Sequence, residues 1–323
     1  MSDFETLVDP MLEMVDLDYE GLRVTAIGGG HGLAQALQAI GEYAERITAV
    51  VSVADDGGSS GRLGPALGIP PPGDSRRALL ALSPGASWWH RVVAYRFDGG
   101  DVAGHSLGNL ILAALSEELG GLEEALRTLG RWLGARGAVV PVAAAGLEME
   151  ALIGGELVKG QVAVARARGR IEEIRLLPAE VRAAPSAVEA VMAADQIVLG
   201  PGSLFTSVIA ALKVPGMAEA LNAAGGRLAY VCNLTTQDGE TLGMDAVAHV
   251  EALVRHTGIR APDAVVAHQG RLAVPPGLEP VEVDRDRLGA MGCRVESAEL
   301  ADPAAPWPQH DPARLGAVLR RLA

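Results

Sequence analysis

Short apolar runs alternate with helix-spaced apolar positions along most of the chain. The runs at 22–27 and 47–53 are apolar and rich in β-branched residues, which is typical of buried parallel strands. Between them, apolar residues from Leu33 to Ile40 recur at helical spacing, so the three segments predict a right-handed β-α-β unit. The same patterns predict further strands at 197–199, 228–232 and 264–267 and helices at 76–82, 107–119, 122–133, 204–212, 244–256 and 312–322.

The pattern changes between about residues 141 and 177. Short alternating segments at 147–153, 160–165 and 171–176 are separated by glycines, which predicts antiparallel hairpins. We therefore expect an α/β fold, a Rossmann-like parallel sheet with helices on both faces and a small antiparallel β insertion. A single domain over residues 21–323 should contain the insertion at 141–177 and a short β/α tail from about residue 262.

Composition and charge narrow the class of protein. Hydrophobic residues make up 49% of the 323 residues but aromatic ones only 3%, so the core must consist mainly of Ala, Val, Leu and Ile. The formal net charge of −13 argues against general nucleic-acid binding, which requires clustered Lys and Arg. An anionic ligand must therefore be captured locally by backbone amides, a few arginines or a divalent cation.

The cysteines and the N-terminal residues bear on the compartment. Cys232 and Cys293 are too few for a disulfide scaffold, and reduced thiols fit a cytoplasmic protein. We find no signal peptide and no apolar run of about 18 residues, so we expect no membrane insertion. Residues 1–20 carry acidic but no basic side chains, which predicts a flexible acidic arm.

Four polar loops begin where predicted strands end. They are Gly28-Gly29-Gly30-His31-Gly32, 55–62, Gly200-Pro201-Gly202-Ser203 and 233–237. In open α/β sheets, ligands bind in the crevice outside the carboxyl ends of the strands. If these strands share one sheet, the four loops converge on one edge and form the binding site. The second loop belongs to a glycine- and proline-rich stretch at 54–74, which predicts a long loop that is either functional or disordered.

The triglycine loop precedes a helix, so its bare backbone can approach a phosphate while the helix amides point at the anion. It lacks the full dinucleotide-binding spacing and the Lys-Ser/Thr of a P-loop, so an ordinary strand-to-helix turn remains an alternative. His31 is either a ligand contact or an ordinary residue at the start of the helix.

Three aspartates are candidates for a metal site. Asp55 and Asp56 follow a strand, where one or two carboxylates together with ligand phosphates suit Mg2+. Asp74, after a proline run, can supply another oxygen or act as a helix N-cap. We expect Asp56 and Asp74 to hold Mg2+ when a diphosphate is bound, and Asp55 to hydrogen-bond the glycine loop. The alternative is that both Asp55 and Asp56 are structural loop caps.

Further polar residues are candidates for ligand contact. The turn at 200–203 with Thr206 suits a phosphate or a sugar, or merely a well-capped helix. His105, Ser106 and Asn109 lie near one helix start, because spacings of three and four share a helix face. The remaining candidates in or beside the loops are Gly57, Ser59, Ser60, Arg62, Arg76, Asn233 and Gln237.

Taken together, these motifs resemble the YvcK family, the so-called gluconeogenesis factors, relatives of the CofD 2-phospho-L-lactate transferases. The resemblance covers about residues 22–260, and His310-Asp311-Pro312 near the C-terminus resembles the actinobacterial branch. His31 stands where many relatives outside that branch carry Thr, so no general catalytic role is implied. The motifs occur at residues 28–33, 53–63, 71–76, 105–109, 199–207 and 233–241.

The resemblance implies one of two functions. The YvcK branch binds UDP-sugars, notably UDP-N-acetylglucosamine, and supports cell shape and peptidoglycan precursor supply during gluconeogenic growth. The transferase branch moves a phospholactyl group from a guanosine-diphosphate donor to a deazaflavin acceptor, and aspartates matching Asp56 and Asp74 hold Mg2+ there.

Binding of a nucleotide sugar without turnover is the function that we expect. The segments 57–61 and 233–237 carry YvcK signatures, and the scarcity of aromatic residues argues against a site that stacks a deazaflavin ring. An NAD-dependent oxidoreductase is disfavoured because the dinucleotide-binding fingerprint is incomplete. We also expect the protein to form a homodimer.

Overall fold

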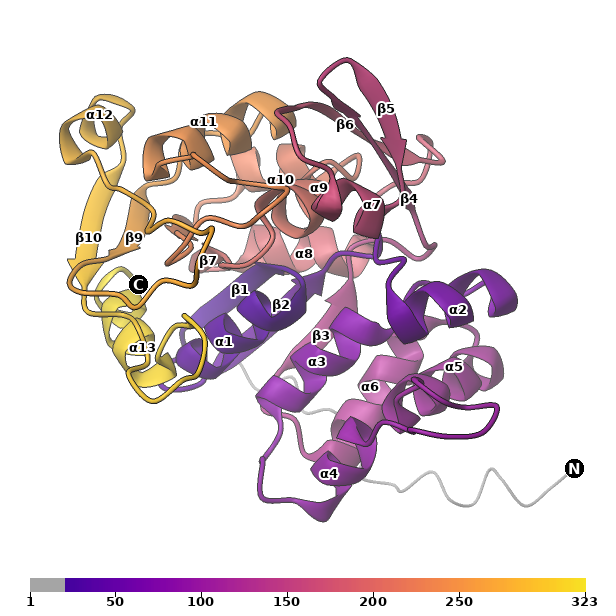
Figure 1. Ribbon diagram of the computed structural model, residues 1–323. Coiled ribbons are helices and arrows are strands. Elements are labelled where there is room, and N and C mark those ends of the chain that lie inside the picture. Colours follow the sequence, from indigo (N-terminus) through magenta and orange to yellow (C-terminus); the bar gives the residue numbers. More distant parts are fainter. Residues whose placement is uncertain (1–20) are drawn as a thin grey trace, which may run out of the picture.

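The computed structural model describes residues 21–323, so the predicted acidic arm at 1–20 lies outside the described residues. The chain forms a seven-stranded sheet in the order β10-β9-β8-β7-β1-β2-β3, and all neighbouring strands are parallel (Figure 1). The predicted α/β fold is thereby confirmed. The strands are β1 (Arg23–Gly28), β2 (Arg46–Val51), β3 (Ala138–Pro141), β7 (Gln196–Leu199), β8 (Arg227–Val231), β9 (Ala264–His268) and β10 (Arg294–Ala298).

Helices pack on both faces of this sheet. One apolar cluster joins the sheet to α1, α3, α6 and α13, and a second joins it to α8, α10 and α11. The helices are α1 (Gly30–Ile40), α2 (Gly58–Leu67), α3 (Gly73–Leu82), α4 (Trp88–Ala94), α5 (Leu107–Leu119), α6 (Leu122–Leu133), α8 (Pro185–Ala193), the π-helix η3 (Leu204–Ile209), α9 (Ala210–Leu212), α10 (Met217–Ala223), α11 (Ala246–Thr257), α12 (Arg285–Ala290) and α13 (Pro312–Arg321).

The central strand β1 shows why its sequence is apolar throughout. Successive side chains of a strand point to opposite faces. Val24 and Ala26 belong to the cluster with α1, whereas Ile27 belongs to the cluster on the other face. Thr25 is the polar exception, and its hydroxyl donates to the Ala190 carbonyl at 2.7 Å. A strand buried on both faces therefore needs apolar residues at nearly every position.

The insertion is a small antiparallel sheet, in the order β5-β4-β6. It consists of β4 (Glu148–Ile153), β5 (Glu156–Lys159) and β6 (Ile171–Leu177). The strand predicted at 160–165 is wrong, because this segment forms the helix α7 (Gln161–Arg166). Its alternating valines resemble a strand, but Asp56 Oδ1 accepts a hydrogen bond from Val162 N at 2.9 Å and so caps the helix start. That contact spans more than a hundred residues, and local periodicity does not reveal it.

Other segments also differ from the expectations. The stretch 54–74 is not a continuous loop, because α2 forms within it despite its glycines, serines and Pro65. In β4, Glu150 is buried and forms an ion pair with Lys159 at 2.5 Å. β3 was not expected because it has only four residues at the start of the predicted insertion.

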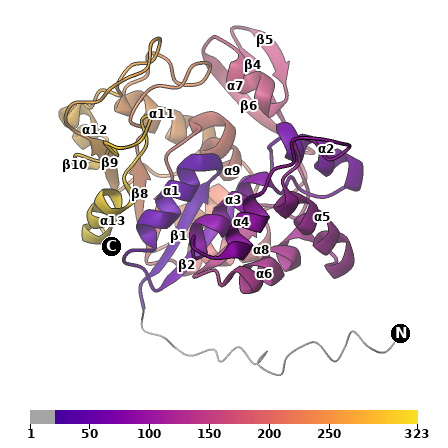
Figure 2. The ribbon, with the colours of Figure 1, turned by 60° about the horizontal axis from the view of Figure 1, so that its bottom comes forward.

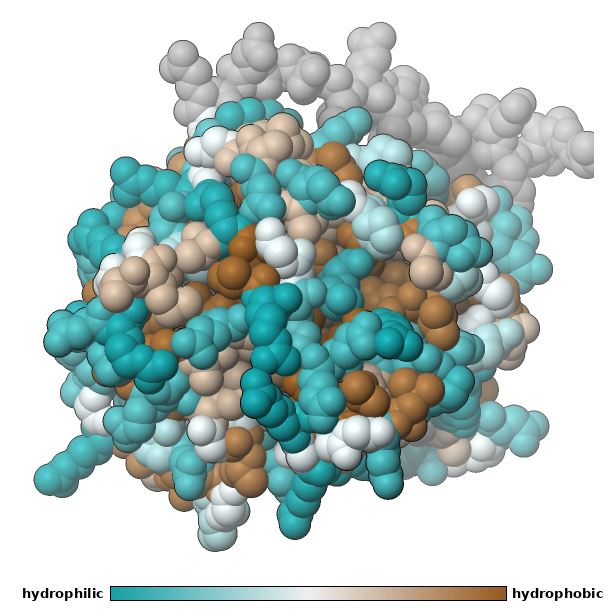
Figure 3. Space-filling view, turned by 90° about the horizontal axis from the view of Figure 1, so that it is seen from above, coloured by the Kyte–Doolittle hydropathy of each residue, from teal (hydrophilic) through white to brown (hydrophobic). Residues whose placement is uncertain are grey.

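In both ribbon views, the C-terminal tail with α12 and α13 lies at one end of the sheet and α5 and α6 lie at the other (Figures 1 and 2). The face in Figure 3 shows small brown apolar patches between teal polar residues. Within residues 21–323, no single helix is long and apolar enough to cross a membrane; only η3–α9 joined to α10, a pair bent by 74°, passes that test.

Candidate functional site

The strand order reverses between β7 and β1. From β1 the chain crosses to β2 on one side, and from β7 it crosses to β8 on the other. A reversal of this kind leaves a crevice outside the carboxyl ends of the two strands, where ligands bind in open α/β sheets. The triglycine loop follows β1 and the loop at 200–203 follows β7, so the two predicted loops are brought together.

The two glycine loops pack directly against each other. A Cβ atom placed on Gly32 would lie 1.9 Å from the carbonyl oxygen of Pro201 and 2.7 Å from Gly202 Cα. Gly202 has a φ of +112°, a conformation that L side chains rarely adopt. Glycine is therefore required here so that backbone meets backbone.

A cleft of about 1220 Å3 opens at this edge of the sheet. This volume exceeds the ~300–1,000 Å3 that is usual for small-molecule sites, and it can hold a nucleotide. The cleft contains predicted site residues from three loops and also residues of the C-terminal tail that were not predicted. Its lining includes His31, Gly32, Pro201, Gly202, Asn233, Gln237, Leu278, Trp307, Gln309 and His310.

Asn233 fixes the glycine loop at the edge of the cleft. Its Oδ1 accepts from Gly202 N at 2.6 Å, and its Nδ2 donates to Gly202 O at 2.7 Å. Both ends of the amide are therefore used within the protein. Gln237, predicted as a ligand contact, also lines the cleft, and its buried Oε1 has no hydrogen-bond partner among the described residues.

The start of η3 is already occupied by a carboxylate. Glu240 accepts hydrogen bonds from Phe205 N at 3.0 Å, from Thr206 N at 3.3 Å and from the Thr206 hydroxyl at 2.7 Å. Burial raises the pKa of Glu240. These groups, which the sequence suggested for a phosphate, therefore bind an internal acid instead. No role was predicted for Glu240, because only the fold brings it to this helix.

A second carboxylate occupies the start of α1. Asp74 Oδ2 accepts from Gly30 N at 2.7 Å, and Asp74 Oδ1 forms an ion pair with Arg77. A Cβ atom on Gly29 would lie 2.5 Å from Asp74 Oδ2, so a glycine is needed for this contact. Burial raises the pKa of Asp74, and the charge of Asp55 raises it further.

The three aspartates separate into different environments. Asp55 Oδ1 accepts from Gly57 N at 2.9 Å, which is the loop contact expected from the sequence. Asp56 turns toward the insertion and accepts from Val162 N, whereas the charge of Asp55 raises the pKa of Asp74. Within residues 21–323 no group of three or more His, Cys, Asp and Glu could hold a metal ion. A pair of carboxylates with ligand phosphates still suits Mg2+, and Asp55 with Asp74 fits that role better than Asp56.

A buried polar network joins α2, α3 and α5. The Ser59 hydroxyl lies 2.9 Å from His105 Nδ1 and accepts from Asn109 Nδ2 at 3.0 Å. Asn109 Oδ1 in turn accepts from Arg76 Nε at 2.8 Å, and the Ser106 hydroxyl accepts from Asn109 N. Three segments predicted as candidates thus meet at one place.

Arg76 is the unusual member of this network. Burial lowers its pKa to about 10, so the guanidinium stays charged at neutral pH. Asp74 counteracts this shift, but it pairs with Arg77, and none of the ion pairs in the described chain includes Arg76. A buried cation without a paired anion is costly, so this position favours an anionic ligand.

The remaining predicted site residues lie around Arg76. Desolvation lowers the pKa of His31, and the charges of Arg77 and Arg76 lower it further, so His31 lies near both arginines. The Ser60 hydroxyl accepts from Gly73 N at 3.0 Å and fixes the start of α3. Arg62 differs from the others, because its guanidinium is bound to the Ala103 carbonyl at 2.8 Å.

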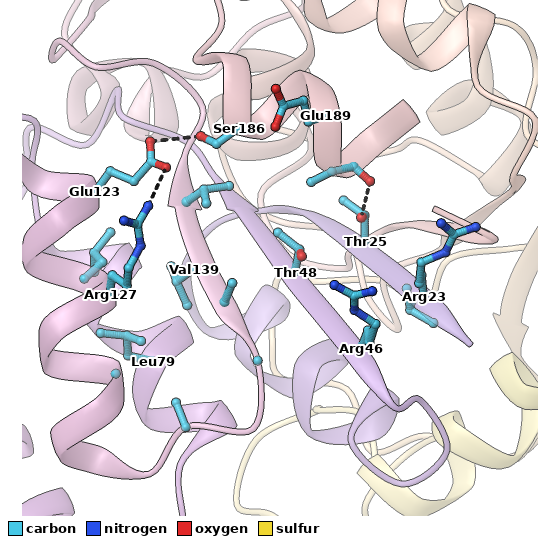
Figure 4. Close-up of a pocket in the computed structure, with 18 of the residues that line it drawn as sticks. Arg23, Thr25, Arg46, Thr48, Leu79, Glu123, Arg127, Val139, Ser186 and Glu189 are labelled. Carbon is cyan, nitrogen blue, oxygen red and sulfur yellow. Dashed lines mark hydrogen bonds and ion pairs between the residues drawn. The ribbon is translucent and has the colours of Figure 1, made fainter. Parts of the chain in front are cut away.

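A separate cavity of about 630 Å3 lies over β1, β2 and β3, between α6 and α8 (Figure 4). It contains Arg23 and Arg46, which begin their strands, so it lies toward the amino ends. Its polar groups pair with one another, as Ser186 with Glu123 at 2.9 Å and Thr25 with a backbone carbonyl. The crevice at the carboxyl ends is therefore the better candidate site.

Comparisons with known proteins agree with this arrangement. The family described as 2-phospho-L-lactate transferase CofD matches residues 24–301. The gluconeogenesis factor of Bacillus subtilis is 36% identical over 306 residues, which cover 92% of this chain and 96% of that protein. A relative from the same gluconeogenesis-factor group in Mycobacterium tuberculosis is 43% identical over 309 residues, covering 92% and 89% of the two chains.

A solved structure supports the same relationship. The crystal structure of a UPF0052 family protein from Bacillus halodurans matches with a TM-score of 0.88 and 35% sequence identity, covering 92% of this chain and 98% of that one. The shared sequence and fold extend over the sheet and the loops that form the crevice. The chain therefore belongs to the CofD family and, within it, to the gluconeogenesis factors, the YvcK group.

Proposed function

We propose that this protein binds a nucleotide sugar, UDP-N-acetylglucosamine, in the crevice between β1 and β7. The observation that carries the proposal is the buried Arg76, which forms no ion pair among the described residues and whose charge acts on His31 in the lining of a cleft of about 1220 Å3. Its guanidinium requires an anion, and the cleft is large enough for a nucleoside. Binding without turnover would make the protein a sensor of this precursor, supporting cell shape and peptidoglycan precursor supply during gluconeogenic growth in the cytoplasm.

The arrangement of charges supports one orientation of the ligand. Arg76, Arg77 and His31 lie together near the start of α1, so we place the diphosphate there. The nucleoside then extends along the loop from Asn233 to Gln237, toward the C-terminal tail. The helix-start amides contribute less than expected from the sequence, because Asp74 and Glu240 already bind several of them.

The first test compares two ligands that differ in the phosphates. UDP-N-acetylglucosamine should raise the melting temperature more than uridine does, because only the nucleotide sugar supplies the anion. A ligand at 100 times its dissociation constant adds about 2.7 kcal/mol to the free energy of unfolding. Differential scanning fluorimetry measures the melting temperatures, and titration calorimetry measures the affinities. Equal affinities for uridine and UDP-N-acetylglucosamine would contradict the proposal.

We also propose that Asp55 and Asp74 hold Mg2+ when a diphosphate is bound, with Asp56 outside this site. The Asp74→Asn variant should lose the Mg2+-dependent gain in UDP affinity, because a neutral amide is a weaker ligand for a hard cation. The matched Asp56→Asn variant should keep that gain, since asparagine still offers an oxygen to Val162 N. Calorimetry with Mg2+ and then with EDTA measures the Mg2+-dependent gain in UDP affinity for each of the two variants. Wild-type affinity that is independent of Mg2+ would refute the metal site.

A 2-phospho-L-lactate transferase activity is the second candidate, and the family match favours it. The neighbouring carboxylates Asp55 and Asp74 would hold the Mg2+ that balances the charge of a guanosine-diphosphate donor. Mass spectrometry of a mixture with the donor and the deazaflavin acceptor decides between binding and transfer. A phospholactyl product formed faster than without protein would establish the transferase.

A further inference from the structure

The C-terminal segment 301–310 forms a closed loop beside the cleft. Ala301 and His310 form an antiparallel bridge at its base, where Asp302 N also donates to Gln309 O at 2.9 Å. Gln35 Nε2 of α1 donates to Gln309 Oε1 at 3.0 Å, which ties the loop to the helix that follows the triglycine loop. The base of the loop is therefore held in place at the wall of the cleft.

Trp307 lies between Pro306 and Pro308 in this loop and lines the cleft. Trp307 is 58% exposed. It is also one of few aromatic residues, which make up only 3% of the chain. Among the described residues that line the cleft, it is the one large aromatic side chain. The flanking prolines restrict the backbone, so less conformational entropy remains to be lost when a ligand orders the indole.

The other exposed tryptophans lack these features. Trp88 and Trp89 stack on each other, with ring centroids 4.5 Å apart. Trp132 on α6 is 56% exposed, but it lines neither this cleft nor the cavity of Figure 4. Trp307 is thus distinguished by its place in the cleft and not by exposure alone.

Buried polar groups in the same cleft independently indicate a ligand. His310 is buried, and its Nε2 has no hydrogen-bond partner in residues 21–323. Gln237 Oε1 is likewise buried and unpartnered, and both residues line the cleft with Trp307. Unpartnered polar atoms cost free energy in a folded protein, and a ligand with donors and acceptors on its edge would remove that cost.

We propose that Trp307 stacks on the nucleobase of the bound nucleotide, while Gln237 and His310 hydrogen-bond the edge of the base. This inference rests on the proposed nucleotide-binding function and assigns the base-recognition end of the site. An indole face suits any base, because every nucleobase has a π-face. Stacking therefore supplies affinity, and the polar pair supplies the preference between bases.

The experiment measures the affinities of UDP, GDP and ADP by calorimetry for wild type and three variants. Trp307→Ala should weaken whichever nucleotides bind by about tenfold or more, and Trp307→Phe should retain most of the affinity. Trp132→Ala is the matched control at an exposed tryptophan, and it should bind as wild type does. Inorganic pyrophosphate, which has no base, should bind equally to wild type and to Trp307→Ala.

The outcomes separate this inference from the function on which it rests. If wild type binds a nucleotide and Trp307→Ala binds it equally well, base stacking is refuted and nucleotide binding stands. A loss of pyrophosphate affinity in Trp307→Ala equal to the loss for nucleotides would also refute stacking. If wild type binds none of the three nucleotides, both proposals fall.

Discussion

Replacing Arg76 by methionine is expected to weaken the binding of UDP-N-acetylglucosamine by about a hundredfold. Methionine keeps an apolar stem of similar shape in the buried position but removes the charge that we assign to binding the phosphates. The pKa of Arg76 is about 10, so wild type should show no loss of affinity from this group between pH 6 and 9. Titration calorimetry at two pH values in this range measures both effects.

Two comparisons make the Arg76 experiment specific. Uridine, which lacks phosphates, should bind Arg76→Met as it binds wild type. Arg127→Met removes an exposed arginine on α6 that takes no part in the network of Ser59 and Asn109, and it should leave the nucleotide affinity unchanged. The assignment of the diphosphate to Arg76 is wrong if Arg76→Met binds the nucleotide sugar as tightly as wild type does.

Replacing Gly32 by alanine should destabilise the whole protein. The new Cβ would lie 1.9 Å from Pro201 O, a backbone atom that cannot move without shifting the loop after β7. Inserting atoms into packed positions costs about 1–3 kcal/mol and sometimes more, and we expect the upper end of this range. The same shift would separate the two loops that form the crevice, so ligand affinity should fall as well. Urea denaturation measures the stability.

Gly99→Ala is the matched control for Gly32→Ala. No atom lies within 4 Å of a Cβ placed at Gly99. The free energy of unfolding of this variant should therefore lie within about 0.5 kcal/mol of the wild-type value, as is usual for surface substitutions. A Gly32→Ala protein as stable as Gly99→Ala would show that the two loops do not pack as described.

The local patterns predicted most of the α/β frame. The helices at 107–119 and 122–133 were predicted with the bounds that the structure has, because their apolar residues recur with helical spacing and glycine follows each C-terminus. The five parallel strands predicted from apolar runs all lie in the main sheet. The strand prediction for 160–165 was wrong. The alternating valines satisfy a strand pattern, but Asp56 caps the start of this segment as a helix.

The meeting of the loops at the candidate cleft was predicted through the rule that parallel strands end at one edge. This rule brought the triglycine loop, the loop at 200–203 and Asn233 together, and the structure places all three at the cleft. It did not reveal how their polar groups are used. Asn233 holds Gly202, and Asp74 binds Gly30 N, so residues that suggested ligand contacts also hold the loops in place.

The sequence by itself thus determined most of the elements, their parallel arrangement and the edge of the sheet at which the polar loops meet, because these depend on local spacing and on a general property of α/β sheets. Only the tertiary structure decided which charged groups have partners within the protein and which remain available to a ligand. Glu240 reaches Thr206 from 34 residues away, and Arg76 reaches Asn109 from 33, so neither contact follows from periodicity. The tail that carries Trp307 joins the cleft because it crosses beside α1. Such contacts depend on how packed elements meet in space, and local propensity contains no information about them.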